Sequence, residues 1–290
     1  MKSILIVCTG YIGDTLMASS VAKKLKEEEQ FEIVDFTIPV LQPLELLDNN
    51  PFIDNVFFGS EYKKPMKEYD KTVILPLVDQ SKTPPFQFQE AAGVKNPDSE
   101  YEVYTDKMFD YSVQLQLHTA RGSGPIIGWQ SNWEEKSFGF TEEEYKKGIN
   151  VPEVGYGGRR RDIKYIVEEI RKEFPAMIEV GFPPGTGVHD IGLSTTANFS
   201  MSASMLKFCD YFIGGEGGLC NLAAGVGTKT IITGDFVHQL YGWNGVIKKI
   251  KEPKLGPEFY FKEGHISLNP YLLDREVVDE MVKIIGNNGR

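Results

Sequence analysis

Two glycine-rich turns carry the residue types in this sequence that could do chemistry. The first, residues 10–14, reads Gly-Tyr-Ile-Gly-Asp, and the second, residues 214–219, reads Gly-Gly-Glu-Gly-Gly-Leu. Glycines let a backbone approach a ligand closely, and the start of a helix favours an anion. Each turn also holds one carboxylate, Asp14 or Glu216, that could exchange a proton with a substrate. Together they indicate acid–base chemistry next to a phosphate.

Neither turn is a specific signature on its own. The first is not a full Gly-x-Gly-x-x-Gly, and no Lys-Ser/Thr pair follows it as in a P-loop. From its position alone, Asp14 is explained more simply as the N-cap of the helix that follows. The second turn could be a tight connection to a helix of small residues, but a charge at Glu216 is costly there without a partner.

The elements around the first turn form a strand–helix–strand unit. Residues 3–8 are continuously apolar and β-branched, which predicts a buried parallel strand. Residues 15–29 have a helical pattern, and residues 31–38 read as a second strand. Such a unit belongs to a parallel sheet with helices on its faces. The following segment continues this alternation with a short helix from 44, strands at 55–58 and 71–77, a loop with a short helix at 78–97, and a helix at 106–118.

A flexible run at residues 121–125, Arg-Gly-Ser-Gly-Pro, predicts a domain boundary. Beyond it, strands and helices alternate again, with strands predicted at 126–129, 177–180, 211–213 and 230–233 and helices at 161–174, 202–209 (capped by Ser200), 219–226 and 274–285. We therefore predict an N-terminal domain over 1–122 and a C-terminal domain over 123–273. The final helix, 274–290, is predicted to pack back on the first domain.

Composition sets outer limits on function. The chain has 290 residues, 41 % of them hydrophobic, and a net charge of −10. This acidic balance disfavours nucleic acid and anionic membranes as partners without excluding a local basic patch. The three cysteines form no Cys-x-x-Cys pair, which fits a reducing compartment. No stretch approaches the roughly 20 apolar residues of a membrane span, so we expect a cytoplasmic protein, with peripheral membrane contact left open.

The two turns and their surroundings resemble the family 9 glycosyltransferases, the heptosyltransferase-like group. Residues 4–25 are similar to the family's opening strand, Gly-x-Ile-Gly-Asp turn and helix. Residues 209–234 are similar to its second signature, with an acidic residue in a glycine turn, Leu-x-x-Leu-Ala-Ala and Gly-Thr, and residues 47–56 resemble its Pro-hydrophobic-Asp connection. The resemblance implies the GT-B architecture, in which two doubly wound Rossmann-like domains face each other across a cleft. It also implies an enzyme that moves a sugar from a nucleotide-diphosphate sugar.

The resemblance also implies roles for single residues. Asp14 would be the general base that takes the proton from the acceptor hydroxyl, in a turn whose other members are Gly10, Tyr11 and Gly13. Glu216 stands where the family usually has Asp, near the sugar and phosphates of the donor. The remaining donor contacts would come from Gly217, Gly218, Leu219 and Asn221.

Other implied contacts match the family less closely. Asn221 stands where the heptosyltransferases have His, so the donor sugar and its base stay open. The family's Lys after the first C-terminal strand has no clear counterpart, and Lys136, with Arg159 as its substitute, is our candidate. Asp235 and His238 follow a predicted strand at its carboxyl end, where α/β sheets bind ligands.

The chemistry itself limits the mechanism. The sequence has no Asp-x-Asp pair to hold a metal–diphosphate complex, so the start of the helix near Gly217 and a Lys or Arg must stabilise the leaving diphosphate. We therefore expect an inverting, metal-independent transferase with no cofactor beyond its nucleotide-sugar co-substrate. The acceptor could be a saccharide, a lipid-linked saccharide or another hydroxyl compound.

Two other functions fit the same residues. One is a sugar-nucleotide epimerase or hydrolase on the same fold, with Glu216 as an extra acid–base group. The other is a degenerate protein that binds a nucleotide sugar without turnover, because Glu216 and Asn221 depart from the family pattern. Replacing Asp14 with Asn separates these functions. Sugar transfer should collapse if the protein is a transferase, whereas ligand binding should survive in all three cases.

Overall fold

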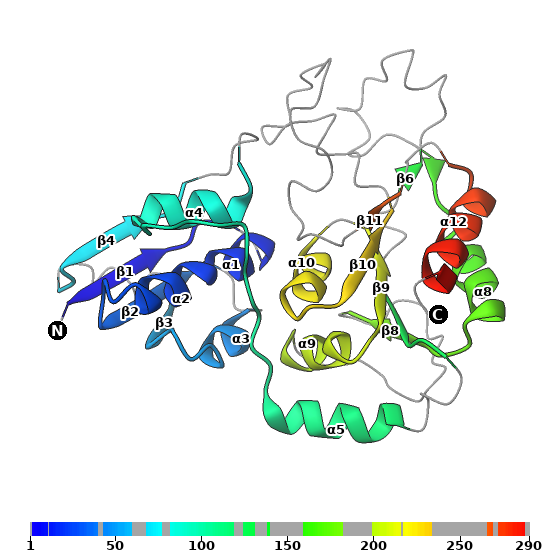
Figure 1. Cartoon of the computed structure of the whole chain (residues 1–290), viewed down its shortest axis with the longest axis horizontal. Helices are drawn as coiled ribbons and strands as arrows, with labels where there is room; N and C mark the ends of the chain where they lie inside the picture. Colours follow the sequence, from blue (N-terminus) through cyan, green and yellow to red (C-terminus); the bar gives the residue numbers. More distant parts are fainter. Residues whose placement is uncertain are drawn as a thin grey trace, which may run out of the picture.

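The computed structural model describes most of the chain. Its described residues are 2–10, 12–39, 43–59, 68–76, 82–118, 124–130, 138–139, 159–181, 199–215, 217–233, 266–268 and 272–287. Within them, two parallel sheets lie side by side, each with its own helices (Figure 1). We call the first sheet and its helices the first lobe and the second sheet and its helices the second lobe.

The first lobe is built on a four-stranded sheet in the order β3-β2-β1-β4, in which every pair is parallel. Its strands are β1 Ser3–Val7, β2 Ile33–Ile38, β3 Asn55–Phe58 and β4 Lys71–Ile74, and its helices are α1 Ile12–Ala18, α2 Ser20–Glu27, α3 Leu44–Asp48 and α4 Pro84–Ala92. Ile4, Ile6 and Phe36 from the strands form one buried cluster with Leu25 of α2 and Phe88 of α4. One face of the sheet is therefore covered by α2 and α4, as a β-α-β pattern requires.

The second lobe is built on a five-stranded parallel sheet in the order β11-β10-β9-β5-β8. Its strands are β5 Ile127–Gln130, β8 Met177–Val180, β9 Tyr211–Gly214, β10 Lys229–Ile232 and β11 Ile266–Ser267. Its helices are α5 Lys107–His118, α8 Ile163–Glu173, α9 Phe199–Lys207, α10 Gly218–Gly225 and α12 Asp274–Asn287. A separate antiparallel pair joins β6 Phe138–Gly139 to β7 Arg159–Arg160.

Helices cover both faces of the second sheet. On one face, Phe212 of β9 and Ile178 of β8 pack with residues of α9 and α10. On the other face, Ile213 of β9 packs with residues of α8 and α12. Neighbouring residues of β9 thus point to opposite helix layers, which is why the run 211–213 does not alternate between apolar and polar residues. The predicted arrangement of two doubly wound α/β units is confirmed.

Both sheets reverse their strand order at one place. In the first, β1 lies between β2 and β4, and in the second, β5 lies between β8 and β9. Ligands of open α/β sheets bind at the carboxyl ends of the strands beside such a reversal. The turns after β1 and β9 lie at these positions. The topology therefore places both turns that the sequence singles out where α/β sheets bind ligands.

Two long-range packing predictions need correction. The final helix does not return to the first lobe over Asp274–Asn287, because its apolar side packs against α8 in the second lobe. The helix α5 belongs to the predicted N-terminal domain, but it packs against α9 in the second lobe, with Val113 and Leu117 in that lobe's core. The boundary at 122/123 itself remains a prediction.

Two local predictions also need correction. The single helix expected over 15–29 is divided into α1 and α2, where the hydroxyls of Ser19 and Ser20 bond to the carbonyls of Leu16 and Met17 at 2.7 and 2.8 Å. Such side-chain bonds to the preceding turn compete with regular helix geometry. Ser200 does not cap α9, because it is the second residue of the helix and its buried hydroxyl has no hydrogen-bond partner among the described residues.

Candidate active site

Asp14 lies in the first turn of α1, with its carboxylate folded back over the preceding turn. A Cβ atom at Gly10 would lie 2.5 Å from Oδ2 of Asp14, so only glycine leaves room for this side chain. Asp14 is 8 % exposed. Because α1 begins at Ile12, Asp14 is the third residue of the helix and does not occupy the cap position. The turn therefore holds a buried carboxylate at a helix start.

Two small side chains, Cys8 and Thr15, lie near Asp14. The thiol of Cys8 and the hydroxyl of Thr15 are 3.5 Å apart, and both residues are buried. Burial raises the pKa of the Cys8 thiol, and the negative charge of Asp14 raises it further. Cys8 is thus a neutral neighbour of Asp14, and a thiolate nucleophile is disfavoured at this position.

The second turn leads into α10. Its last residue before the helix, Gly217, has φ 151° and ψ −169°, a backbone conformation that side chains strongly disfavour. The helix that follows is buried from Cys220 to Gly225. The first N–H groups of a helix have no carbonyl of their own helix to bond. Gly218 and Leu219 therefore bring backbone donors to the carboxyl end of β9.

The structure brings the two turns together. A Cβ atom at Gly13 would lie 2.4 Å from Nδ2 of Asn221, and one at Gly218 would lie 3.1 Å from Cγ2 of Ile12. The starts of α1 and α10 are therefore in direct contact. A side chain at Gly13 would overlap Asn221, and one at Gly218 would require Ile12 to shift slightly. Both helices direct the positive ends of their dipoles to this junction, which favours an anion there.

Asn221 lies at the centre of the junction. It is 5 % exposed, and its Nδ2 donates to the carbonyl of Gly217 at 3.4 Å. Its Oδ1 is buried without a hydrogen-bond partner in the described part of the chain. A buried polar atom left unpaired is costly. The position therefore fits a residue whose polar group serves a ligand or a neighbour that is not described.

The lobes are also joined by a segment that the sequence did not single out, residues 98–106, which we call the connector. The hydroxyl of Tyr101 donates to the carbonyl of Asn221 at 2.9 Å, and the N–H of Val103 donates to the carbonyl of Gly225 at 2.9 Å. Burial raises the pKa of Tyr101 well above 10, so this hydroxyl stays protonated and donates. No local pattern marks Tyr101, because its partner is 120 residues away.

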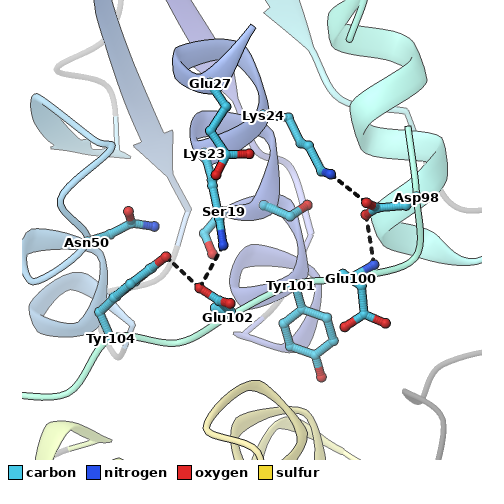
Figure 2. A pocket seen from close by; sticks show the side chains of 11 residues that line it. Ser19, Lys23, Lys24, Glu27, Asn50, Asp98, Glu100, Tyr101, Glu102 and Tyr104 are labelled. Atoms are coloured by element: carbon cyan, nitrogen blue, oxygen red, sulfur yellow. Dashed lines mark hydrogen bonds and ion pairs between the residues drawn. The ribbon is translucent and has the colours of Figure 1, made fainter. Parts of the chain in front are cut away.

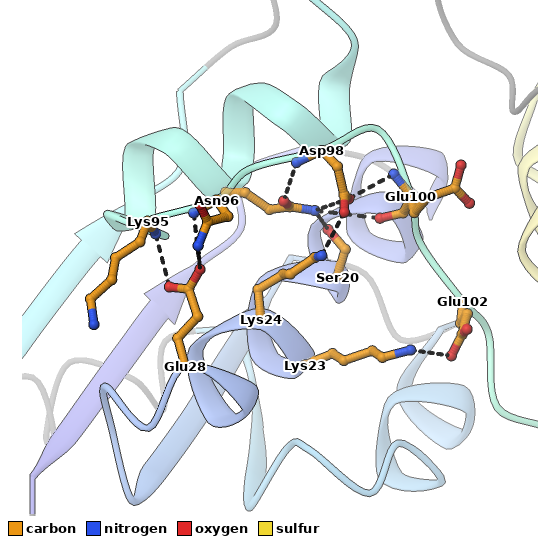
Figure 3. Close-up of polar contacts among 10 residues, drawn as sticks. Ser20, Lys23, Lys24, Glu28, Lys95, Asn96, Asp98, Glu100 and Glu102 are labelled. Atoms are coloured by element: carbon orange, nitrogen blue, oxygen red, sulfur yellow. Dashed lines mark hydrogen bonds and ion pairs between the residues drawn. The ribbon is translucent and has the colours of Figure 1, made fainter.

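The other side of the connector is held by α2 and α4. Lys23 pairs with Glu102 at 3.1 Å and Lys24 with Asp98 at 2.5 Å, while Glu28 accepts hydrogen bonds from the N–H groups that precede the connector (Figure 3). The two lysine–carboxylate pairs line an open cavity of about 290 Å³ between α2 and the connector (Figure 2). Its lysines are paired with carboxylates, and Tyr101 borders it while directing its hydroxyl toward α10. The cavity does not contain the residues that the sequence assigned to the site.

The structure shows where part of the predicted site lies, and the roles of these residues remain predictions. It brings together Gly10, Gly13, Asp14, Gly217, Gly218, Leu219 and Asn221. Tyr11, Lys136, Glu216, Asp235 and His238 lie outside the described residues, and of Arg159 only the backbone in β7 is described. Gln130, at the end of β5, was missed, although it stands at a strand end beside the strand-order reversal.

No metal or membrane element is evident in the described residues. No group of three or more His, Cys, Asp or Glu residues that could hold a metal ion occurs among them. None of the described helices is long and apolar enough to cross a bilayer.

The fold is that of known glycosyltransferases. Over 100 % of both chains, it is similar to ADP-heptose LPS heptosyltransferase II of Escherichia coli, with a TM-score of 0.60 and 13 % identity. A family 9 glycosyl transferase from Veillonella parvula matches with a TM-score of 0.63 and 12 % identity over 99 % of this chain and 97 % of that one. The E. coli heptosyltransferase WaaC, solved with ADP-2-deoxy-2-fluoro heptose, matches with 0.52 and 11 % over 99 % of each.

Sequence comparison adds no closer relative, because no family model and no curated protein matches the chain. The structural likeness extends over both lobes and is accompanied by little sequence identity. It establishes the fold: this chain has the GT-B architecture of two Rossmann-like units, as the sequence predicted.

Proposed function

We propose that this protein is a glycosyltransferase that moves a sugar from a nucleotide-diphosphate sugar to an acceptor hydroxyl. The observation that supports it best is the contact between the starts of α1 and α10, which brings the Asp14 helix against the helix that begins at Gly218. One helix supplies a carboxylate and the other supplies backbone donors. Sugar transfer needs this pair, a base for the attacking hydroxyl and a site for the leaving diphosphate.

In the proposed reaction, the acceptor oxygen attacks the anomeric carbon of the donor sugar. A new C–O bond forms as the bond from that carbon to the diphosphate oxygen breaks, and Asp14 receives the proton of the hydroxyl. The bonding electrons leave with the diphosphate, whose charge the dipole of α10 and its first N–H groups stabilise. A single displacement of this kind inverts the anomeric centre.

The remaining predicted residues complete the proposal. Glu216 directly precedes Gly217 in the chain, so we assign it to the donor sugar or its phosphates, with Asn221 beside it. Lys136 or Arg159 would add positive charge, and Asp235 and His238 would border the donor. Gly10, Tyr11 and Gly13 would form the acceptor side, which takes a saccharide, a lipid-linked saccharide or another hydroxyl compound.

The fold neighbours suggest which nucleotide to try first. WaaC was solved with an ADP-heptose analogue, and the heptosyltransferase TibC with ADP-D-β-D-heptose, with a TM-score of 0.57 over 77 % of that chain. ADP is therefore our first probe. TibC is described as iron-containing, so our proposal that this transferase needs no metal requires its own test.

The first experiment measures the melting temperature of the purified protein with ADP, GDP and UDP and with their available sugars, each with and without EDTA. A ligand that binds the folded state raises the melting temperature by mass action. We expect one diphosphate to stabilise the protein whether or not EDTA is present, and its sugar derivatives then become donors for transfer assays. A shift that EDTA abolishes would contradict metal independence. If no diphosphate or sugar gives a shift, the donor-site proposal is wrong.

A further inference from the structure

The turn before α10 is held by groups from three neighbouring elements. The N–H of Gly215 donates to Oε1 of Gln130 in β5 at 3.0 Å. The carbonyl of Gly215 accepts from the thiol of Cys220 in α10 at 2.8 Å. The carbonyl of Gly214 accepts from the N–H of Thr233 after β10 at 2.9 Å. Gly214 and Gly215 are therefore held by protein contacts before any ligand arrives.

Among these contacts, that of Gln130 is the one made by a long polar side chain. Gln130 is 3 % exposed. A Cβ atom added at Gly214 would lie 2.6 Å from Oε1 of Gln130 and 3.1 Å from Cβ of Gln130. Since Trp129 pairs with Ile213 in the sheet, the next residues of the two strands lie side by side. Glycine at 214 thus makes room for Gln130 to lie across the turn.

The position of Gln130 gives this contact its significance. β5 and β9 are the two strands between which the sheet reverses its strand order, and Gln130 and Gly214 are their last residues. Burying an amide side chain costs free energy unless it is hydrogen-bonded, so a buried glutamine here is a poor choice for packing alone. An apolar side chain of the same size would leave the buried N–H of Gly215 without this acceptor.

We propose that Gln130 is a positioning residue for the diphosphate of the donor. Its amide oxygen holds Gly215, which lies two residues before Gly217, the residue that precedes α10. In this proposal, holding Gly215 orients the first N–H groups of α10. Gln130 does not contact the substrate in this proposal and acts only through the turn. The inference rests on the proposed function, because it presupposes that a nucleoside diphosphate binds at the start of α10.

Two substitutions break the same contact from opposite sides. Gln130→Met keeps the length of the side chain but removes the acceptor, and Gly214→Ala places a methyl group where the amide oxygen lies. The probe is whichever of ADP, GDP or UDP binds the wild-type protein, measured by titration calorimetry. We expect either variant to raise the dissociation constant about tenfold, which corresponds to ~1.4 kcal/mol. We expect the double variant to bind no more weakly than the weaker single variant, because the contact can be lost only once.

A control variant separates positioning from general loss of stability. Thr228→Val removes another buried hydrogen bond of the second lobe, from the Thr228 hydroxyl to the carbonyl of Leu206, beyond the far end of α10. We expect this variant to melt at a lower temperature but to bind the diphosphate with unchanged affinity. Equal loss of affinity in Thr228→Val would mean that Gln130 acts through stability alone, which overturns the proposal.

The remaining outcomes are also distinguishable. If the wild-type protein binds none of the three diphosphates, the proposed function fails and the role of Gln130 falls with it. If the wild type binds but Gln130→Met binds equally well, the proposed function stands and the positioning role is wrong. Additive losses in the double variant would likewise overturn it. Should Gln130→Met not fold, Gly214→Ala alone decides, and unchanged affinity in that variant refutes the proposal.

Discussion

The glycine-rich turns of the two lobes share a setting but differ in what lies against them. In the first lobe, the space over Gly10 is occupied by Asp14, a side chain from the helix that the turn itself begins. In the second lobe, the space over Gly214 is occupied by Gln130, a side chain from the neighbouring strand. The carboxylate of the first turn is thus positioned by a glycine of the same turn, whereas the backbone of the second turn depends on a neighbouring strand.

This difference corresponds to what each turn offers a ligand. The first turn holds one carboxylate at a helix start, so its chemistry resides in a side chain. The second offers backbone N–H groups, whose positions depend on the course of the chain through Gly214, Gly215 and Gly217. The orientation of one side chain can be set by residues of its own turn. The orientation of several backbone N–H groups requires that the backbone itself be held in place. We therefore expect substitutions in the first turn to affect the rate of transfer and those in the second to affect donor affinity.

The largest effect is expected for Asp14→Asn. The amide has the same shape as the carboxylate but cannot take a proton from the acceptor, so the transfer rate should fall about 1000-fold, within the range for loss of a general base. Affinity for the diphosphate should stay within about twofold, because the substituted group belongs to the chemical step. The measurements are the rate of transfer at saturating donor and the dissociation constant by calorimetry.

Asp35→Asn is the matched control for that substitution. Asp35 is a buried aspartate of the same lobe, and its carboxylate accepts hydrogen bonds from Asn55 and Tyr69 within the sheet and its surroundings. We expect Asp35→Asn to change stability and to leave the transfer rate of the folded protein near that of the wild type. A transfer rate in Asp14→Asn close to that of the wild type would remove Asp14 from the reaction.

The second-largest effect, again on the transfer rate, is expected for Gly10→Ala. The added Cβ would lie 2.3 Å from Cβ of Asp14, so the carboxylate must move. A displacement of about 1 Å at a reacting group can cost about 100-fold in rate, and we expect the transfer rate to fall by about that factor while donor affinity holds. The double variant Gly10→Ala/Asp14→Asn should be no slower than Asp14→Asn alone.

Gly286→Ala serves as the control for added volume. A Cβ at Gly286, in α12, meets nothing within 4 Å, so this variant should transfer sugar at the wild-type rate. If Gly10→Ala slows Asp14→Asn further, Gly10 has a role apart from making room for the carboxylate, and the proposed dependence of Asp14 on Gly10 is incomplete.

A smaller effect, on donor affinity more than on the transfer rate, is expected for Gly217→Ala. The φ of 151° at this position is strained for any side chain, at a cost of about 1–3 kcal/mol. Because the backbone before α10 must shift to relieve it, we expect the dissociation constant of the diphosphate to rise about tenfold, equivalent to ~1.4 kcal/mol. The rate with saturating donor should fall much less. A variant that lost rate and kept affinity would abolish the contrast between the two turns.

The sequence predicted the parts of the fold that depend on neighbouring residues. Continuous apolar runs such as 3–8 and 211–213 are strands because they are buried on both faces, and that requirement is visible in each run alone. The division of residues 15–29 into two helices was missed. Its cause is the pair of hydroxyls at Ser19 and Ser20, which bond to the preceding turn instead of simply facing solvent.

The parts that the sequence could not predict depend on residues far apart in the chain. The apolar side of α12 could have packed on either lobe, and only the surface of α8 decides which. For α5, the anchor is Lys207, which pairs with Asp110 at 2.6 Å across 97 residues. In the site, the glycines predicted both turns, but nothing local marked Gln130 or Tyr101 as their supports.

The smallest effect is expected for Tyr101→Phe, which tests how the two turns are kept in contact. The Tyr101 hydroxyl joins the connector to the carbonyl of Asn221, and Figure 2 shows its ring pointing toward α10. Losing this buried hydrogen bond should lower the free energy of unfolding by ~1 kcal/mol, measured by urea denaturation. Tyr104→Phe is the matched control, because that hydroxyl bonds to Glu102 within the connector at 2.7 Å and spans no lobe boundary. If Tyr101→Phe lowered the transfer rate as much as Gly10→Ala, contact between the lobes would matter more than the seating of Asp14, and the two turns would have to be regarded as one unit.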